Sequence, residues 1–335
     1  MTVDYLCSEK QQMMKKDIGA LSREDADASS KAAVCYHVPV LRERSVQMLV
    51  TDPDGIYIDV TFGGGGHSRA ILEHLSDKGR LFGVDRDPDA AANAPDDARF
   101  TFIASDFRYL THWTDYYGIT QVNGILADLG VSSHHFDTPE RGFSFRYGAA
   151  LPDMRMNTRG GRTAADLLNA APEQEIADIL FRYGELKDAR RIAASLVQAR
   201  QKAPITTIDE LVSVLQPYLP RASEQRRSKL SRIFQAFRIA INDELGALKA
   251  LLAASEELLV PGGRIAVLTY HSLEDRIVKQ WFRQGAGTSA ENELIYGAAP
   301  KLFQAVNNRP IVADDEEIAH NNRARSAKLR VAEHR

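Results

Sequence analysis

The stretch IYIDVTFGGGGH, residues 56–67, decides the fold of this chain. A β-branched run ends at Asp59, and four consecutive glycines follow shortly after it. An apolar run that stops at glycines is typical of a buried strand that enters a tight turn. Apolar residues then recur at helical spacing over residues 70–75, and the Lys-Gly pair at 78–79 is a helix stop. The sequence therefore predicts a strand, a glycine loop and a helix in direct succession.

The glycines have a chemical meaning in this position. Without Cβ atoms the backbone can take positive φ and approach a ligand closely, beside the exposed N–H groups of a helix start. A dinucleotide-binding loop, G-x-G-x-x-G, would need a third glycine where Ser68 stands. Asp59 before the loop instead suits a cofactor with a positively charged amino-acid part, such as S-adenosylmethionine. A glycine-rich turn without a ligand is the alternative.

Size and composition exclude several classes of protein. At 335 residues the chain can hold two domains, and no apolar run approaches the roughly 20 residues of a membrane span. The N-terminus lacks the hydrophobic stretch of a signal peptide. Two cysteines, Cys7 and Cys35, cannot make a disulfide framework and lack metal-ligand spacing. We therefore expect a cytoplasmic protein without a metal site or a membrane segment.

The basic residues are clustered although the net charge is −3. Three windows each contain five Lys or Arg residues and one acidic residue: 141–162, 221–232 and 323–335. Such runs can be ordinary solvated faces. On an otherwise acidic chain they also suit a localised surface that binds the phosphates of a nucleic acid.

Three further strands are expected over residues 80–85, 99–104 and 122–127. A polar residue ends or follows each of these strands. In an open α/β sheet, ligands bind beyond the carboxyl ends of the strands. Asp85 can accept hydrogen bonds from both ribose hydroxyls of an adenosine cofactor, or it can cap the next helix. Asp106 can meet the adenine amino group, and Phe107 can pack on the ring or belong to the core. Asp128 leaves the fourth strand at the same edge.

The distance to the next strand indicates an insertion. Residues 264–270 form that strand, and it begins about 135 residues after Asp128, far beyond an ordinary crossover of about a dozen residues or more. Apolar residues at helical spacing, such as Ile176, Ile179 and Leu180, indicate helices between them. We expect a flexible tail over 1–35, a first part of the sheet domain over 36–140, an inserted helical domain over 141–245, and a second part with a basic C-terminal tail over 246–335.

Finer features are expected within this plan. Residues 207–210 make a capping-box pattern. A single long helix is expected from about residue 228 to 252, and the Pro-Gly-Gly at 261–263 should end that segment and lead into the fifth strand. Ser272 and Asp275 can cap the helix that follows. Residues 294–298 and 301–306 suit a hairpin, and residues 326–333 suit a last strand.

Several motifs in order resemble one family: D-x-TFGGGGHS (59–68), DRDP (85–88), DLGVSS (128–133), RGFSF (141–145), DMRM (153–156), FQAFRI (234–239), HSLEDR (271–276) and RARSAKLR (323–330). Together they resemble the RsmH family, also called MraW, of bacterial small-subunit ribosomal RNA cytosine methyltransferases. The likeness runs from about His37 to Arg330 and leaves the first 35 residues outside it.

The resemblance implies a class I S-adenosylmethionine-dependent methyltransferase, a doubly wound Rossmann-like α/β sheet with a helical insertion. It would act on the exocyclic N4 amine of a cytosine in the decoding region of 16S ribosomal RNA, within the small ribosomal subunit. The resemblance also implies these cofactor contacts by motif position: Gly65, Gly66, His67, Asp85, Phe107 and Asp128. His134-His135 replace the usual Pro-Gln, so His135 is a weaker carry-over, and Tyr270 replaces a common Phe.

The chemistry of methyl transfer points to an acceptor beside the amine. The amine of cytosine is a poor nucleophile because its lone pair is delocalised into the ring, and an acceptor that binds an amine hydrogen helps to localise it. Asp128 is the first candidate for this catalytic role, with the backbone carbonyls of residues 129–131 as alternatives, or it binds only the amino group of the cofactor. His271 can assist or cap a helix. An unstacked base needs a lining, which aromatic residues can supply if they are not core: Phe143, Phe145 or Tyr270.

Two other classes of protein stay open from the sequence. A dinucleotide-dependent oxidoreductase shares the glycine loop and Asp85, although Ser68 and Asp59 count against it. An RNA-binding assembly factor with an inactive methyltransferase fold would show the same motifs. The oligomeric state does not follow from the sequence.

Overall fold

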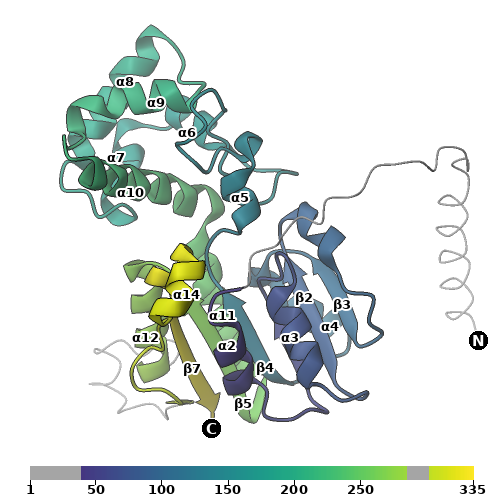
Figure 1. Cartoon of the computed structure of the whole chain (residues 1–335). Helices are drawn as coiled ribbons and strands as arrows, with labels where there is room; N and C mark the ends of the chain where they lie inside the picture. Colours follow the sequence, from purple (N-terminus) through teal and green to yellow (C-terminus); the bar gives the residue numbers. More distant parts are fainter. Residues whose placement is uncertain (1–38, 285–301) are drawn as a thin grey trace, which may run out of the picture. The chain divides into compact units, whose positions relative to one another are not determined.

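The computed structural model describes residues 39–284 and 302–335. One seven-stranded sheet has the order β3-β2-β1-β4-β5-β7-β6 (Figure 1). The strands are β1 (Ile56–Asp59), β2 (Arg80–Asp85), β3 (Phe100–Ala104), β4 (Val122–Asp128), β5 (Leu259–Thr269), β6 (Phe303–Ala305) and β7 (Lys328–His334). The pairs among β1 to β5 are parallel, whereas β7 runs antiparallel to both β5 and β6.

The order of the strands places a switch point at the centre of the sheet. From β1 the chain moves outward to β2 and β3, and then returns to lay β4 on the other side of β1. In an open α/β sheet, ligands bind at the carboxyl ends of the strands where the order reverses. The fold therefore predicts a ligand site at the residues that follow β1 and β4.

Helices lie on both faces of the sheet (Figure 1). Alternate residues of the central strands pack against these two layers. Ile125 and Ala127 of β4 pack with α4 (Leu110–Tyr116), α11 (Glu244–Leu258) and α12 (Ser272–Gln284). Leu126 between them packs with α2 (Arg42–Leu49) and α3 (Gly66–His74). This burial on both faces explains why the strands are near-continuous apolar runs in the sequence.

A second group of helices encloses a hydrophobic cluster of its own, which includes Leu168, Ile176, Leu196 and Phe237. The helices of residues 133–242 are α5 (Ser133–Asp137), α6 (Ala164–Ala170), α7 (Glu173–Arg182), α8 (Ala189–Lys202), α9 (Ile208–Leu215) and α10 (Ser223–Asn242). The capping box expected at the start of α9 is confirmed, because the Thr207 and Glu210 side chains exchange hydrogen bonds with each other's backbone N–H. The cluster supports an inserted domain over 141–245, whose bounds stay a prediction.

The single long helix expected on the return from the insertion is wrong. Asp243 takes a left-handed conformation with φ 44° and separates α10 from α11. The amide of Asn242 accepts from the Met156 N–H at 2.8 Å and donates to the Met154 carbonyl at 2.7 Å. Arg108 donates to the Asp243 carboxylate at 2.9 Å. These long-range hydrogen bonds hold the break, and no helix-breaking residue marks it in the sequence.

The caps expected for α12 also differ. Glu274 accepts from the backbone N–H of Tyr270 at 2.9 Å and of His271 at 3.4 Å. Ser272 instead donates to Glu185, and Asp275 accepts from Arg330. Nδ1 of His271 accepts from the Glu274 N–H at 3.4 Å in return, so His271 and Glu274 cap the helix reciprocally, and the capping role expected for His271 is confirmed.

The remaining differences concern strand ends. Strand β5 already begins at Leu259, so the Pro-Gly-Gly lies inside it, where the pairing with β4 shifts register between Val122 and Gly124. The last strand is confirmed as β7. The tail over 1–35 and the hairpin arm over 294–298 lie outside the described residues. Among the helices of the described part, each is too short or too polar to cross a membrane.

Candidate functional site

The glycine loop joins β1 to α3 as expected. Gly65 has φ 73°, and a Cβ there would lie 2.8 Å from the ring of Phe62, so the turn requires glycine. Asp59 is fully buried beneath the loop. Its carboxylate accepts from the Ser68 hydroxyl at 2.7 Å and from the Thr61 N–H at 3.2 Å, and burial raises its pKa. Asp59 therefore ties the strand to the helix.

Asp85 lies against the same loop. Its carboxylate accepts from the N–H of Gly63 at 2.7 Å and from the N–H of Asp87 at 2.8 Å. Burial raises its pKa to about 6, because the cost of an ionised buried group exceeds the benefit of these hydrogen bonds. The ends of β1 and β2 thus meet as expected, and the ribose contact of Asp85 stays a prediction.

Asp128 is the centre of a second group at the end of β4. Its backbone N–H donates to the Thr61 hydroxyl at 2.6 Å, and its Oδ2 lies 3.4 Å from Nε2 of His67. The hydroxyl of Tyr270 donates to its Oδ1 at 2.6 Å. Three elements, β4, α3 and the end of β5, therefore converge on one carboxylate. The contact between Asp128 and Tyr270 was not predicted from the sequence. The parallel strands β4 and β5 end at Asp128 and immediately before Tyr270, and their adjacency could have indicated it.

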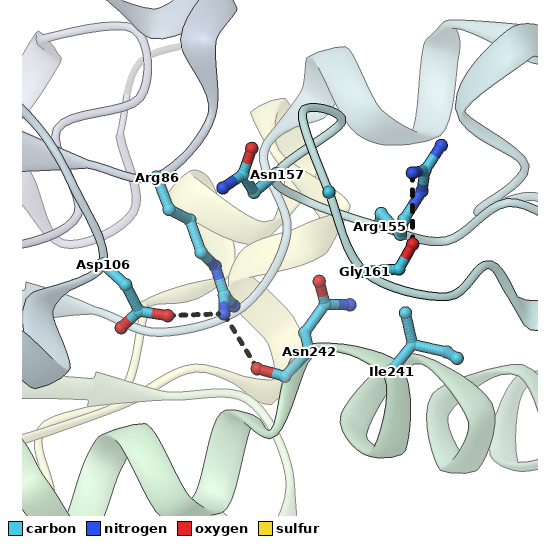
Figure 2. Close-up of a pocket in the computed structure, with 8 residues that line it drawn as sticks. Arg86, Asp106, Arg155, Asn157, Gly161, Ile241 and Asn242 are labelled. Carbon is cyan, nitrogen blue, oxygen red and sulfur yellow. Dashed lines mark hydrogen bonds and ion pairs between the residues drawn. The ribbon is translucent and has the colours of Figure 1, made fainter.

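The two residues expected around the adenine, Asp106 and Phe107, lie in different surroundings. Phe107 is buried in the core with the α4 and α11 side chains. Asp106 accepts from Arg86 at 3.2 Å and lines a small cavity of about 160 Å³. In Figure 2 the guanidinium of Arg86 lies between Asp106 and the main-chain carbonyl of Asn242, to which it donates at 2.9 Å. Arg86 thus connects the end of β2 to the end of α10, a contact that sequence reasoning did not find.

His135 is held inside the protein. Its Nε2 lies 2.7 Å from Oδ2 of Asp87, its Nδ1 lies 2.9 Å from the Ser132 hydroxyl, and burial lowers its pKa. Its ring packs against Phe143. Arg141 is buried on the same Asp87 carboxylate, at 3.0 Å. The cofactor contact of His135 stays a prediction, and these contacts give it a structural role.

Of the three aromatic residues considered as a lining for an unstacked base, two belong to the hydrophobic cluster of the insertion and one lies at the candidate site. Phe143 is buried and Phe145 packs edge-on against Phe234, both in the cluster of the insertion. Tyr270 is half-buried and directed at Asp128. Of the three, Tyr270 is therefore the one placed at the candidate site.

His271 belongs to a buried polar cluster. Its Nδ1 accepts from the Glu274 N–H at 3.4 Å, and its Nε2 lies 3.0 Å from the Glu274 carboxylate. Ligand atoms of Glu244, His271 and Glu274 lie within 4.8 Å of one another, a donor set that suits a metal. Arg238, however, makes two hydrogen bonds of 2.8 Å to Glu244 and supplies the positive charge there. The arrangement thus serves as a salt-bridged connection.

Some of the basic residues in the three windows are buried or paired with an acidic residue. Arg141 is buried, and Arg155 pairs with Asp153 at 2.8 Å. Arg323 lies 3.6 Å from Asp137, whose carboxylate also accepts from Arg146 at 2.9 Å. The first and third windows therefore meet at Asp137. Arg141 is therefore not part of a surface, and the phosphate-binding role of the other arginines stays a prediction.

The chain is similar to several known proteins. The MraW methylase family matches residues 34–335. A ribosomal RNA small subunit methyltransferase H of Parabacteroides distasonis is 51% identical over 300 residues, covering 89% of this chain and 97% of the relative. The protein of the same name from Bacteroides fragilis is 52% identical over 298 residues, with the same coverage. A crystal structure of a putative rRNA-methylase from Clostridium thermocellum covers 88% of this chain and 95% of its own, at 14% identity and a TM-score of 0.40.

Proposed function

The chain belongs to the MraW methylase family, and from this premise we propose that it methylates the exocyclic N4 amine of a cytosine in the decoding region of 16S ribosomal RNA. At the level of the family, the chain is an S-adenosylmethionine-dependent methyltransferase of class I fold that acts on small-subunit ribosomal RNA. The family, the fold class and the cofactor expected from the sequence are thus confirmed. The cytosine, its N4 atom and the assembled subunit as substrate belong to the proposal.

The residues around the glycine loop fit S-adenosylmethionine. The positive φ of Gly65 brings bare backbone to the start of α3, and Asp85 lies beside the loop with acceptor oxygens for ribose hydroxyls. The ring of His67 is buried, and within the described residues its Nδ1 has no hydrogen-bond partner, while its Nε2 has only the Asp128 carboxylate at 3.4 Å. A buried polar atom without a partner at this point suits a bound ligand.

The observation that carries the catalytic assignment is the convergence on Asp128. S-adenosylmethionine would supply, when bound, a methyl group on a sulfonium, and in-line attack by the amine on that methyl carbon would displace the neutral thioether. As the N4–methyl bond forms and the sulfur–methyl bond breaks, the amine must lose a proton. We assign Asp128 to accept a hydrogen bond from the amine and then that proton. The carboxylate suits this role because the Tyr270 hydroxyl holds it directly, and the Thr61 hydroxyl holds the backbone N–H of Asp128.

The test uses the full chain, labelled S-adenosylmethionine and small ribosomal subunits that lack the modification. Digestion of the RNA and mass spectrometry should give N4-methylcytidine. Asp128→Asn should slow transfer by about 10²- to 10⁴-fold, the usual contribution of a general base, while the Kd of the cofactor changes less than about threefold. Asp115→Asn, at an exposed carboxylate on α4, is the matched control.

Each contrary result has a distinct meaning. A different methylated nucleoside refutes the cytosine N4 assignment. Unchanged transfer by Asp128→Asn removes Asp128 from catalysis, and a loss confined to cofactor binding leaves it as a cofactor ligand. Absence of transfer by the unmodified chain favours the inactive assembly factor. Preference for NAD over S-adenosylmethionine in equilibrium binding would favour the oxidoreductase.

A further inference from the structure

Tyr270 makes the shortest side-chain contact to the proposed acceptor. Its hydroxyl lies 2.6 Å from Oδ1 of Asp128, whereas Nε2 of His67 lies 3.4 Å from Oδ2. Oδ1 is therefore occupied by a strong hydrogen bond, and Oδ2 keeps capacity to accept from a ligand.

The hydroxyl acts as a donor in this contact. Burial, followed by the charge of Asp128, raises the pKa of Tyr270 well above its ordinary value. The phenol therefore stays protonated over the working pH range, and Tyr270 cannot serve as the base itself. A protonated phenol beside a carboxylate has one arrangement, in which the O–H donates and the carboxylate accepts.

The ring is held in place from two sides. The backbone N–H of Tyr270 donates to Glu274 at 2.9 Å, which fixes the corner between β5 and α12. Gly130 has φ 119°, and a Cβ there would lie only 3.3 Å from the Tyr270 ring. The glycine thus allows the loop after Asp128 to pass over the ring. Both ends of the hydrogen bond belong to segments that the fold fixes, so its direction is set before any ligand binds.

We propose that Tyr270 is a positioning residue for methyl transfer, whose hydroxyl fixes the rotamer of Asp128 and leaves Oδ2 directed to the amine. This inference rests on the proposed function, because it concerns the carboxylate assigned there as acceptor. It goes beyond that function by assigning a role to a second side chain, which acts through the carboxylate. A purely structural hydroxyl would affect the melting temperature without affecting the rate of transfer.

The test compares Tyr270→Phe with Tyr270→Leu in single-turnover methyl transfer to small subunits. Tyr270→Phe should lower the rate about tenfold, as expected for the loss of a hydrogen bond to a charged group, with the Kd of the cofactor and the KM for subunits within about twofold. Tyr270→Leu should be at least as slow. If Tyr270→Phe has the unmodified rate while Tyr270→Leu is slow, only the ring matters and the proposal is wrong.

A double-mutant cycle separates positioning from other causes. In an Asp128→Ala background, Tyr270→Phe should change the remaining rate by less than about twofold, because the hydroxyl acts through the carboxylate. Additive effects of the two changes would overturn the proposal, and so would an effect of Tyr270→Phe on cofactor Kd alone. Failure of the proposed function appears separately, as a wrong nucleoside product of the unmodified chain.

Discussion

Replacing Arg141 with methionine measures how firmly the start of the insertion is tied to the sheet domain. Arg141 is buried, and its guanidinium donates to Asp87 at 3.0 Å and to the Met156 carbonyl at 2.9 Å. His135 contacts the same Asp87 carboxylate at 2.7 Å. Methionine keeps much of the side-chain volume but removes the charge and every side-chain donor, so Asp87 loses one of its two side-chain partners.

The expected cost follows from the burial of the pair. Removing one partner of a buried ion pair costs about 3–5 kcal/mol, and we expect the lower end because His135 remains. At about 2–4 °C per kcal/mol for large domains, the melting temperature should fall by about 6–12 °C. Arg146→Met is the matched control: Arg146 pairs with Asp137, but the two side chains are 57% and 50% exposed. An exposed pair contributes less than about 1 kcal/mol.

The pH dependence gives a second readout. Burial alone would raise the pKa of Asp87, but hydrogen bonds from His135 and Arg141 outweigh it and hold the pKa well below its ordinary value. A depressed folded pKa stabilises the fold above the unfolded pKa, and this stabilisation is lost as the pH falls towards the folded pKa. Urea unfolding should therefore show the full deficit of Arg141→Met at pH 7 and a smaller one below about pH 4. A deficit no larger than that of Arg146→Met at pH 7 would refute the reasoning.

Three further outcomes are expected. Burial raises the pKa of Asp85 to about 6, so cofactor affinity by calorimetry should rise as the pH increases through that value, when the carboxylate ionises and can accept from ribose hydroxyls; Asp85→Asn should remove the inflection. Because the pKa of Asp85 is raised in the folded state, the contribution of Asp85 to the free energy of unfolding decreases as the pH increases from about 4 to about 6. Gly65→Ala should cost about 1–2 kcal/mol in urea unfolding because of its positive φ, whereas Gly160→Ala, with open space around it, should cost less than about 1 kcal/mol. Neutralising Arg323 and Arg325 should lower the slope of log K for subunit binding against log salt by up to about 2 without changing cofactor Kd; an unchanged slope would reject a phosphate-binding role.

The sequence was most informative where local chemistry determines structure. Apolar runs that end at glycine or acidic residues located the central strands, because buried parallel strands have that pattern. The capping box at Thr207 was equally local, since both partners lie within one turn of helix. The break at Asp243 could not be found in this way. It depends on Asn242 and Arg108, whose partners are distant in sequence.

Charge clusters illustrate the same limit. Arg141 and Arg146 stand five residues apart in one basic window, yet the first is buried against Asp87 and the second is exposed beside Asp137. Their partners are set by how α5 and the loop after it pack, not by the local sequence. A window of charge therefore predicts that a surface exists, but it does not predict which arginines belong to it.

The three acidic residues at the sheet edge show how register separates side chains of equal chemistry. Pairing places Asp59 opposite Gly83 of β2 and opposite Leu126 of β4. Asp85 and Asp128 thus lie two residues further towards the carboxyl edge, or about 6–7 Å at the usual rise of a strand. This offset explains why Asp59 is fully buried and binds Ser68, whereas Asp128 can meet a ligand. The sequence places an acid at the end of β1, β2 and β4, but only the pairing of the strands distinguishes the acid that is fully buried beneath the loop from the two that we propose face the cofactor.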